Sequence, residues 1–325
     1  MLIAINYHYI RENFDLPYPS IFGIRPDAFR RQLETLGQWG SFVSQESILQ
    51  SIRGQKPLPE KAFIITFDDG LKEQYQIALP ILKELGIPAI FFVNPRVFEE
   101  AHVLGVHKIH QLRSVVAPSL LKKKIEDFIF SQDQGKQLGS YQEKALSHYK
   151  YDKAEISELK YLLNFVLESS ERQQLIDTAF HETFSSEEEV NNSLYMEQKH
   201  LKNLYDLGFL GSHSFEHFPI GTLSRNEQDF QVRQSQKYFT KLLGSPLPSF
   251  SYPYGSYEAC NGLEGILVDN DFEFAFTMER GINHNLSNSF HLSRFDNNDL
   301  PSGKAWKGPL KDPFEVLPSA KWSFK

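Results

Sequence analysis

The stretch that decides the fold is residues 63–70, Phe-Ile-Ile-Thr-Phe-Asp-Asp-Gly. Its first five residues form a nearly continuous apolar run, which is typical of a β-strand buried on both faces of a parallel sheet. The run ends at Asp68 and Asp69, and Gly70 then favours a turn. Two adjacent carboxylates would repel each other and lose hydration if nothing paired with them. The stretch therefore fits two interpretations, a solvated turn and a site where one carboxylate binds a cation while the other faces a substrate.

Similar apolar runs recur along the chain and alternate with amphipathic helices. We expect helices from Pro26, through residues 77–85 up to Gly86, and over about 224–243 up to Gly244. Strands that alternate with helices imply a parallel sheet. The pattern predicts an α/β fold with a closed or nearly closed (β/α)7-type barrel, and a doubly wound open sheet is the alternative. The expected strands are residues 2–7, 63–67, 89–93, 209–212, 249–252, 272–277 and 290–295.

The strand–helix rhythm breaks in the middle of the chain. Residues 95–204 are mostly polar, with helical stretches near 159–165 and 175–180 and an acidic turn over 185–192. We therefore expect a barrel from residues 1–94 and 205–300, a helical insertion over 95–204 that could cover the barrel mouth, and a C-terminal tail over 301–325. His107 and His110 follow the third strand and could reach a substrate, but the preferred interpretation places them on an exposed face of an insertion helix.

The composition excludes several classes of protein. Hydrophobic residues make up 41% of the 325 residues, which is too many for a disordered chain. The net charge is −7 and the only basic run is Lys122–Lys124, which is typical of a solvated helix face, so we expect no nucleic-acid partner. Cys260 is the single cysteine, which excludes an internal disulfide and a thiolate metal cluster.

The amino terminus reads as a strand and not as a signal peptide, and no segment approaches the roughly 20 apolar residues that would span a bilayer. We therefore expect a cytoplasmic protein whose contact with a membrane, if any, is peripheral.

Polar residues follow several of the expected strands at the point where each strand ends. In both predicted folds, the functional groups belong at the carboxyl ends of the strands. His8, Asp68 and the pair His213 and His217 all stand at such ends. Two histidines four residues apart share one face if the chain turns helically, and with one carboxylate they form the open ligand set of a catalytic zinc site. The alternative is a pair of surface histidines on a loop.

A third polar cluster follows the strand near residue 250. Pro253, Tyr254 and Gly255 predict a tight turn that presents a backbone N–H and an aromatic wall. An ordinary strand-to-loop turn is the simpler interpretation of this tripeptide alone.

Taken together, the three clusters resemble the first three motifs of the NodB-homology polysaccharide deacetylases. Their order and their placement at strand ends also resemble that family, over residues 1–94 and 205–295. The motifs are Thr66-Phe67-Asp68-Asp69-Gly70, His213-Ser214-Phe215-Glu216-His217 and Tyr252-Pro253-Tyr254-Gly255. The resemblance implies a distorted (β/α) barrel and metal-dependent amide hydrolysis. It implies that Asp69, His213 and His217 bind one divalent metal ion, most often Zn²⁺, and that Asp68 is the general base. In the turn of Pro253 and Tyr254, the Tyr254 N–H would bind the oxyanion.

The chain departs from the family pattern at two positions. The third motif normally begins with an arginine that orients the base, but Ser251 stands there, and Arg294 is our candidate replacement. The family's late leucine-x-histidine, which supplies the general acid, is also not plain, because His291 precedes Leu292 and is out of register. Tyr7 and His8 resemble a branch of the family that includes the periplasmic poly-N-acetylglucosamine deacetylases, in which the acid histidine comes from the first strand. We therefore assign the acid to His8; the alternative is a histidine that only bonds a carboxylate.

These residues predict a metal-dependent N-deacetylase of an N-acetylated saccharide. A cytoplasmic chain would act on a precursor, such as a nucleotide sugar, a lipid-linked sugar or a growing surface glycan. Two alternatives stay open. One is a hydrolase of a formamido group or a non-sugar amide. The other is a non-catalytic saccharide-binding module, which Ser251 and the unclear late histidine would favour.

Overall fold

The computed structural model describes residues 1–18, 21–99, 101–131, 141–148, 153–167, 169–307 and 309–322. The chain forms two compact units. The first consists of residues 1–12, 23–102 and 191–325, and the second consists of residues 13–22 and 103–190. No helix in the described part of the chain is both long enough and apolar enough to cross a membrane.

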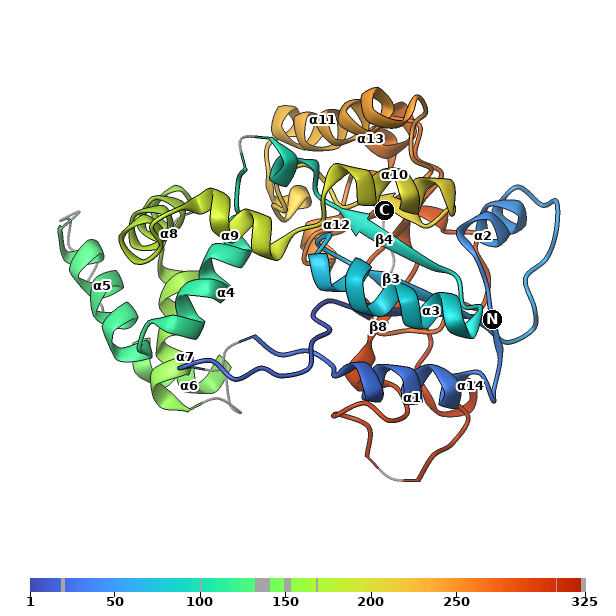
Figure 1. Ribbon diagram of the computed structural model, residues 1–325, viewed down its shortest axis with the longest axis horizontal. Helices are drawn as coiled ribbons and strands as arrows, with labels where there is room; N and C mark the ends of the chain where they lie inside the picture. The colour runs from blue at the N-terminus through green and yellow to red at the C-terminus, as the bar shows by residue number, and fades with distance from the viewer. Residues whose placement is uncertain are drawn as a thin grey trace. The chain divides into compact units, whose positions relative to one another are not determined.

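A mostly parallel sheet forms the centre of the first unit (Figure 1). Its strand order is β7-β6-β5-β4-β3-β1-β8, and β2 pairs with β3 beside this path. The strands are β1 Leu2–Tyr7, β2 Ser41–Phe42, β3 Ala62–Phe67, β4 Ala89–Val93, β5 Leu210–Ser212, β6 Ser249–Ser251, β7 Phe274–Phe276 and β8 Arg294–Asp296.

The sheet curves into a nearly closed barrel, as the sequence predicts. The segment that ends in β8 joins its two edges. Leu292 forms a β-bridge with Phe276, the last residue of β7. Arg294, two residues later, pairs in register with Ala4 of β1. The predicted α/β barrel is confirmed. The last strand is shorter and later than expected, because residues 289–291 form a short 3₁₀ helix, η5.

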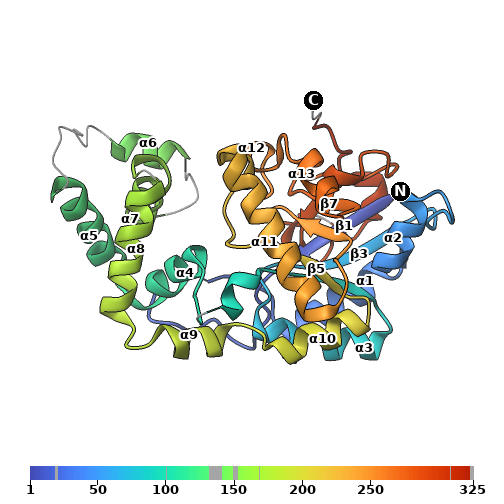
Figure 2. The same cartoon turned by 90° about the horizontal axis from the view of Figure 1, so that it is seen from above.

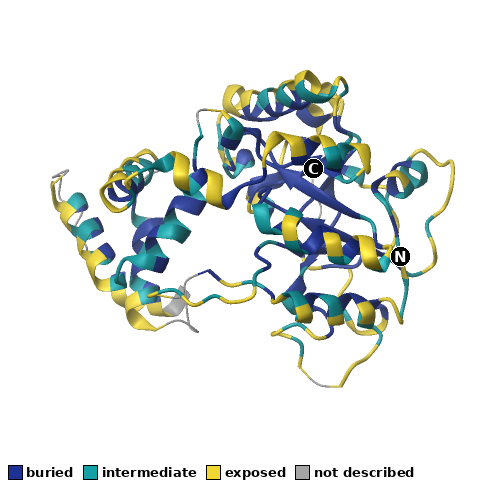
Figure 3. Cartoon of the chain, in the orientation of Figure 1, coloured by how far each residue is buried: buried dark blue, intermediate teal, exposed yellow. Residues whose placement is uncertain are grey.

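Alternation along the strands divides the buried side chains into two cores. Ala4, Ile64, Phe92 and Phe276 belong to one cluster. Ile3 and the other residues of opposite parity pack in a second, larger cluster with the apolar faces of the surrounding helices. Figure 3 shows the strands buried and the outer helical faces exposed. Phe92 fills the space beside Gly211, where an added Cβ would lie 2.4 Å from its ring.

Helices surround the sheet of the first unit (Figure 2). The predicted helix starting at Pro26 and the predicted ends at Gly86 and Gly244 are confirmed, since both glycines have left-handed backbone at φ 65° and 83°. The π-helix η1, Gln74–Ala78, precedes α3. The helices of this unit are α1 Pro26–Leu36, α2 Gln45–Ile52, α3 Leu79–Leu85, α10 Gln198–Asp206, α11 Arg225–Leu243, α12 Tyr257–Cys260, α13 Glu264–Asp269 and α14 Pro313–Val316, with the 3₁₀ turns η2 Pro95–Phe98, η4 Ile220–Thr222 and η6 Asn297–Asp299.

The described residues of the second unit are mostly helical between positions 103 and 190, whereas those between positions 13 and 22 are not. It contains α4 Gly105–Val115, α5 Pro118–Ser131, α6 Tyr141–His148, α7 Ala154–Tyr161, the π-helix η3 Leu162–Val166 and α8 Ser169–Thr183. Helix α9, Glu187–Leu194, begins in this unit and ends in the first. The acidic turn predicted over 185–192 is therefore wrong. Three glutamates in the first turn favour a helix there, because they complement the positive end of the helix dipole.

The boundaries of the units differ from the expected domains. Residues 95–102 and 191–204 group with the barrel, where Leu201 and Leu204 enter the outer core. Residues 13–22 group with the second unit although they precede it in sequence. The tail groups with the barrel too. The Ile282 N–H donates to the Pro318 carbonyl, and the Ala320 N–H donates to the Ile282 carbonyl.

Candidate active site

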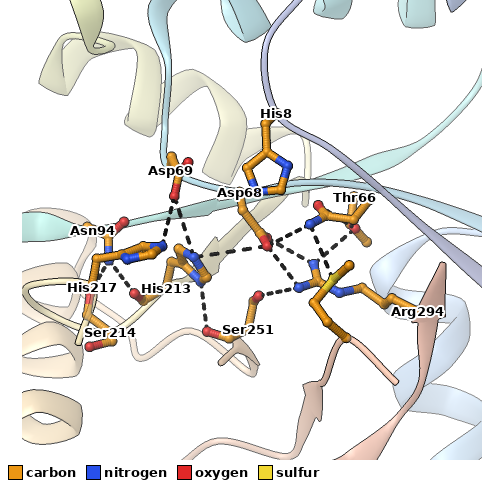
Figure 4. Close-up of polar contacts among 12 residues, drawn as sticks. His8, Thr66, Asp68, Asp69, Asn94, His213, Ser214, His217, Ser251 and Arg294 are labelled. Carbon is orange, nitrogen blue, oxygen red and sulfur yellow. Dashed lines mark hydrogen bonds and ion pairs between the residues drawn. The ribbon is translucent and has the colours of Figure 1, made fainter. Parts of the chain in front are cut away.

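A buried ion pair joins β3 to β8 at the carboxyl end of the barrel (Figure 4). The Arg294 guanidinium donates to both carboxylate oxygens of Asp68, at 2.9 Å and 2.8 Å. Arg294 is level with Ala4, two residues before the Asn6 position, so its long side chain must run through the barrel to reach the strand end. Asn6 adds a further hydrogen bond of 3.0 Å to Asp68. This bidentate geometry fixes the carboxylate in one orientation.

All five N–H donors of Arg294 have acceptors. Besides the two bonds to Asp68, the guanidinium donates to the Thr66 hydroxyl at 3.2 Å, the Ser251 hydroxyl at 2.8 Å and the Thr277 carbonyl at 3.1 Å. The guanidinium carbon also lies 5.8 Å from the ring centres of two phenylalanines, Phe92 and Phe276. Full pairing allows a charged group to sit in the barrel with no solvent exposure.

The electrostatics keep Asp68 ionised. Burial alone would raise the pKa of this carboxyl, but the Arg294 guanidinium, together with His213 and His8, lowers it to about 2. The contribution of His8 places its imidazole close to Asp68, and Figure 4 shows it entering from the end of β1. Asp68 is therefore a carboxylate throughout the neutral pH range.

Asp69, His213 and His217 converge beside this pair. The Asp69 Oδ1 atom lies 3.6 Å from His213 Nε2 and 3.3 Å from His217 Nε2. One donor atom from each of the three residues lies within 4.8 Å of the others. Atoms bound tetrahedrally at about 2.0–2.1 Å from a zinc ion would be roughly 3.3–3.4 Å apart, so the spacing fits such a cation. Two imidazoles and a carboxylate leave coordination positions for water and substrate.

The tautomer of His213 suits this role. Its Nδ1 lies 2.8 Å from the Ser251 carbonyl oxygen, to which it can only donate, so the lone pair of the neutral ring is on Nε2. Burial lowers the pKa of His213 to about 4, with Asp68 opposing this shift, so the ring is neutral near pH 7. A neutral imidazole is the form that binds metal.

Four residues of the site have left-handed backbone that only glycine adopts easily. Asp69, Ser214, His217 and Tyr254 have φ between 60° and 81°. Each such residue costs about 1–3 kcal/mol and persists only where its surroundings hold it. This backbone also corrects one expectation: the chain does not turn helically after β5, and the two histidines meet because Ser214 and His217 bend the loop.

Two buried amides hold the loop that carries both histidines. The Asn94 Nδ2 donates to the carbonyl oxygens of His213 and Ser214. The Gln231 side chain accepts from the Glu216 N–H at 2.9 Å and from the Ser214 hydroxyl at 3.3 Å. The sequence analysis missed both residues, and Asn6 as well. Their positions in the sequence could have indicated a role, because Asn6 interrupts an apolar strand near its end and Asn94 directly follows β4.

Tyr254 borders the metal ligands from the β6 side. Its ring meets the His217 ring edge-on with 5.0 Å between centres, and its side chain is 51% exposed. Pro253 beside it is buried. The turn therefore presents an aromatic wall at the site, as the sequence predicts.

Three other histidines are not part of this cluster. His291 stacks on Tyr252 with 6.1 Å between ring centres and bonds Asn288. His107 and His110 belong to α4 of the second unit, where their rings lie 5.9 Å apart. The expectation that both are exposed is wrong, because His107 has no accessible surface and His110 is partly buried.

The basic run behaves as expected. Lys122 and Lys124 pair with glutamates of neighbouring helices, Glu158 and Glu182. The run is a salt-bridged helix face.

The comparisons with known proteins agree with this geometry. A poly-β-1,6-N-acetyl-D-glucosamine N-deacetylase of Escherichia coli K12 is 36% identical to this chain over 90 residues. That match covers 27% of this chain and only 13% of the relative.

Two solved structures have a similar fold. They are the Streptococcus pyogenes deacetylase PplD in complex with acetate and IcaB from Ammonifex degensii, each with a TM-score of 0.53 and 18% identity. The first match covers 91% of both chains and the second covers 90% of both. At this identity, the likeness concerns the fold alone.

The pattern of the polysaccharide deacetylase family matches residues 55–127 and 171–261, which include all the motif residues from Asp68 to Tyr254. The matched residues make up half of the chain, and they contain Asp68 and the three residues that could hold a cation. The chain belongs to the polysaccharide deacetylase family.

Proposed function

We propose that this protein is a metal-dependent N-deacetylase of an N-acetylated saccharide. The observation that carries the proposal is the pairing of two sites at one barrel end: a carboxylate held ionised by Arg294, and a cation ligand set whose Asp69 is the next residue in the chain. The E. coli relative, whose name specifies poly-β-1,6-N-acetyl-D-glucosamine, suggests the class of substrate. We extend the proposal to surface-glycan chains and their precursors.

Asp69, His213 and His217 would hold the cation, which we propose to be Zn²⁺ because two imidazoles and a carboxylate are a ligand set typical of catalytic zinc. A bound cation would supply an acidified water and polarise the acetamide carbonyl. Asp68 would accept the proton of the attacking water, since it is ionised and its Oδ2 lies 4.0 Å from His213 Nε2. Arg294 aims the Asp68 carboxylate and does not itself touch the substrate.

His8 and Tyr254 complete the chemistry. His8, from the end of β1, would protonate the departing amine of the sugar. The Tyr254 N–H would bind the oxygen on which negative charge develops. The products are a free amino sugar and acetate.

The position of Arg294 also weighs against the non-catalytic alternative. That alternative depended on Ser251 standing where the family has an arginine. Here the Arg294 guanidinium fills the space that a serine leaves and bonds its hydroxyl at 2.8 Å. A module that only binds saccharides would not need a buried, fully paired base.

The test is product analysis with zinc-loaded protein and N-acetylglucosamine oligomers linked β-1,6. We expect acetate and free amine to appear in equal amounts. A panel containing N-formyl sugars and simple acetanilides tests the alternative that the protein hydrolyses a formamido group or a non-sugar amide. Faster hydrolysis of the non-sugar amides would contradict the saccharide assignment.

A further inference from the structure

We propose that the groove between η2, α10 and α11 binds a part of the saccharide chain away from the reacting sugar. This inference rests on the proposed function and deepens it by adding a second contact region for the polymer. The groove has a volume of about 600 Å³ and belongs entirely to the first unit. Figure 1 shows α10 and α11 running beside each other on the outside of the barrel.

The groove has the lining that sugars require. Phe98 and Tyr238 form a stacked aromatic pair, with 6.0 Å between ring centres and 20° between planes. The amide of Gln198 donates to the Tyr238 hydroxyl at 2.9 Å. Aromatic faces contact the C–H surface of a pyranose ring, while amides and hydroxyls bond its hydroxyl groups. Burial raises the pKa of Tyr238 to about 12, so its hydroxyl keeps its proton as a donor.

One face of α11 supplies polar side chains to the groove. Gln234, Lys237 and Lys241 line the groove and lie at helical spacing. Among the residues that the structure describes, none of these three side chains forms a hydrogen bond or an ion pair. Their donors are therefore available to the hydroxyl and carbonyl oxygens of an acetylated glycan. Glu99 adds an acceptor on the opposite side.

The groove is joined to the loop of the cation ligands through η2. Arg96 in η2 donates its N–H to the Phe215 carbonyl at 3.3 Å, and its Nε lies 3.2 Å from the Glu216 carboxylate. Its guanidinium also lies 5.9 Å from the Phe215 ring centre. Phe215 and Glu216 stand between the two histidines of the site. A chain that leaves the reacting sugar along η2 therefore reaches Phe98 and Tyr238.

The inference predicts an affinity that depends on chain length. The probe is a series of β-1,6-linked N-acetylglucosamine oligomers of two to eight sugars, titrated calorimetrically into zinc-loaded protein carrying Asp68→Asn, so that no turnover occurs. We expect the longer oligomers to bind more tightly than the disaccharide. Tyr238→Ala should weaken binding of the longest oligomer about tenfold and leave the disaccharide unchanged.

The Gln234→Ala, Lys237→Ala double variant guards against misfolding, because it removes one partly exposed and one exposed side chain and leaves the stacked rings in place. Thr240→Ala, exposed on α11 but outside the groove, is the matched control and should bind like the parent. Equal affinity of parent and groove variants for every oligomer would overturn the inference, as would equal affinity of all lengths in the parent. Acetate release by the protein that keeps Asp68 tests the proposed function separately. If no acetate is released, the proposed function fails, whatever the binding experiment gives.

Discussion

Arg294 and Asp68 come from strands β8 and β3, and two parallel hydrogen bonds of 2.9 Å and 2.8 Å join them inside the barrel. The bond of 2.8 Å from Arg294 to the Ser251 hydroxyl shows why β6 carries a small residue at this point. A guanidinium entering from β8 occupies the space that a larger side chain on β6 would need. The Asp68 carboxylate is thus oriented by an arginine of β8, and not by one at the position of Ser251.

This arrangement predicts a rescue between two strands. Arg294→Ser should lower kcat at least about 100-fold, because Asp68 loses its partner and becomes a buried unpaired charge. Adding Ser251→Arg should restore at least about tenfold of that loss by returning a guanidinium to the same cavity. Steady-state kinetics on both proteins measures this. If the double variant folds and binds zinc but is no more active than Arg294→Ser, the orienting role is wrong.

A substitution can separate the role of Asp68 in turnover from cation binding by Asp69, His213 and His217. Asp68→Asn should reduce turnover by at least about 100-fold while zinc stays bound, since the amide cannot accept a proton and Asp69 keeps its position. Elemental analysis and acetate release on the same sample provide the two readouts. Turnover like that of the parent would remove Asp68 from the mechanism.

The loss of rate on removing His8 should be larger for a substrate with a poorer leaving group. An amine must be protonated to leave, whereas a nitrophenolate needs no acid. We therefore expect His8→Asn to slow deacetylation of an N-acetyl sugar about 100-fold and to slow hydrolysis of nitrophenyl acetate much less. Equal losses on the two substrates would indicate that His8 only supports the Asp68 carboxylate.

How far the sequence predicts this protein depends on the kind of feature. The apolar run before Asp68 and the glycine after α11 are local signals, so the barrel, its strand ends and its helix ends follow from them. The motifs placed at those ends also single out Asp69, His213 and His217, and the structure brings these three residues together.

The supporting contacts are not local, and the sequence alone does not reveal them. Asn94 acts on residues about 120 positions later in the chain, and nothing near it indicates a partner. The left-handed backbone of Ser214 and His217 is likewise imposed by packing, so residue type favours a helical turn that does not form. The sequence analysis named Arg294 only because Ser251 left a role unfilled.

Acid should destabilise the protein through His291 before it affects Asp68. Burial lowers the pKa of His291 to about 4, so below pH 6.5 the unfolded chain binds a proton that the folded chain does not. Unfolding free energy should therefore fall as the pH drops from about 6.5 to 4, and His291→Gln should reduce that slope. Urea titrations in chelator at several pH values measure it.

The control for this prediction is His284→Gln, which replaces an exposed histidine by the same residue. His213 has a lowered pKa for the same reason as His291, so some of the slope should persist in the His291 variant. A pH dependence identical in the parent and in His291→Gln would contradict the assignment.

The central claim is that Asp69, His213 and His217 hold the cation on which deacetylation depends. The most direct measurement strips the protein with chelator, adds zinc back in steps, and records bound zinc and acetate release from an N-acetylglucosamine oligomer in the same samples. We predict that acetate release rises with bound zinc and levels off at one equivalent, and that Asp69→Ala shows neither. Full acetate release from the stripped protein, or none at one equivalent of zinc, would contradict the account.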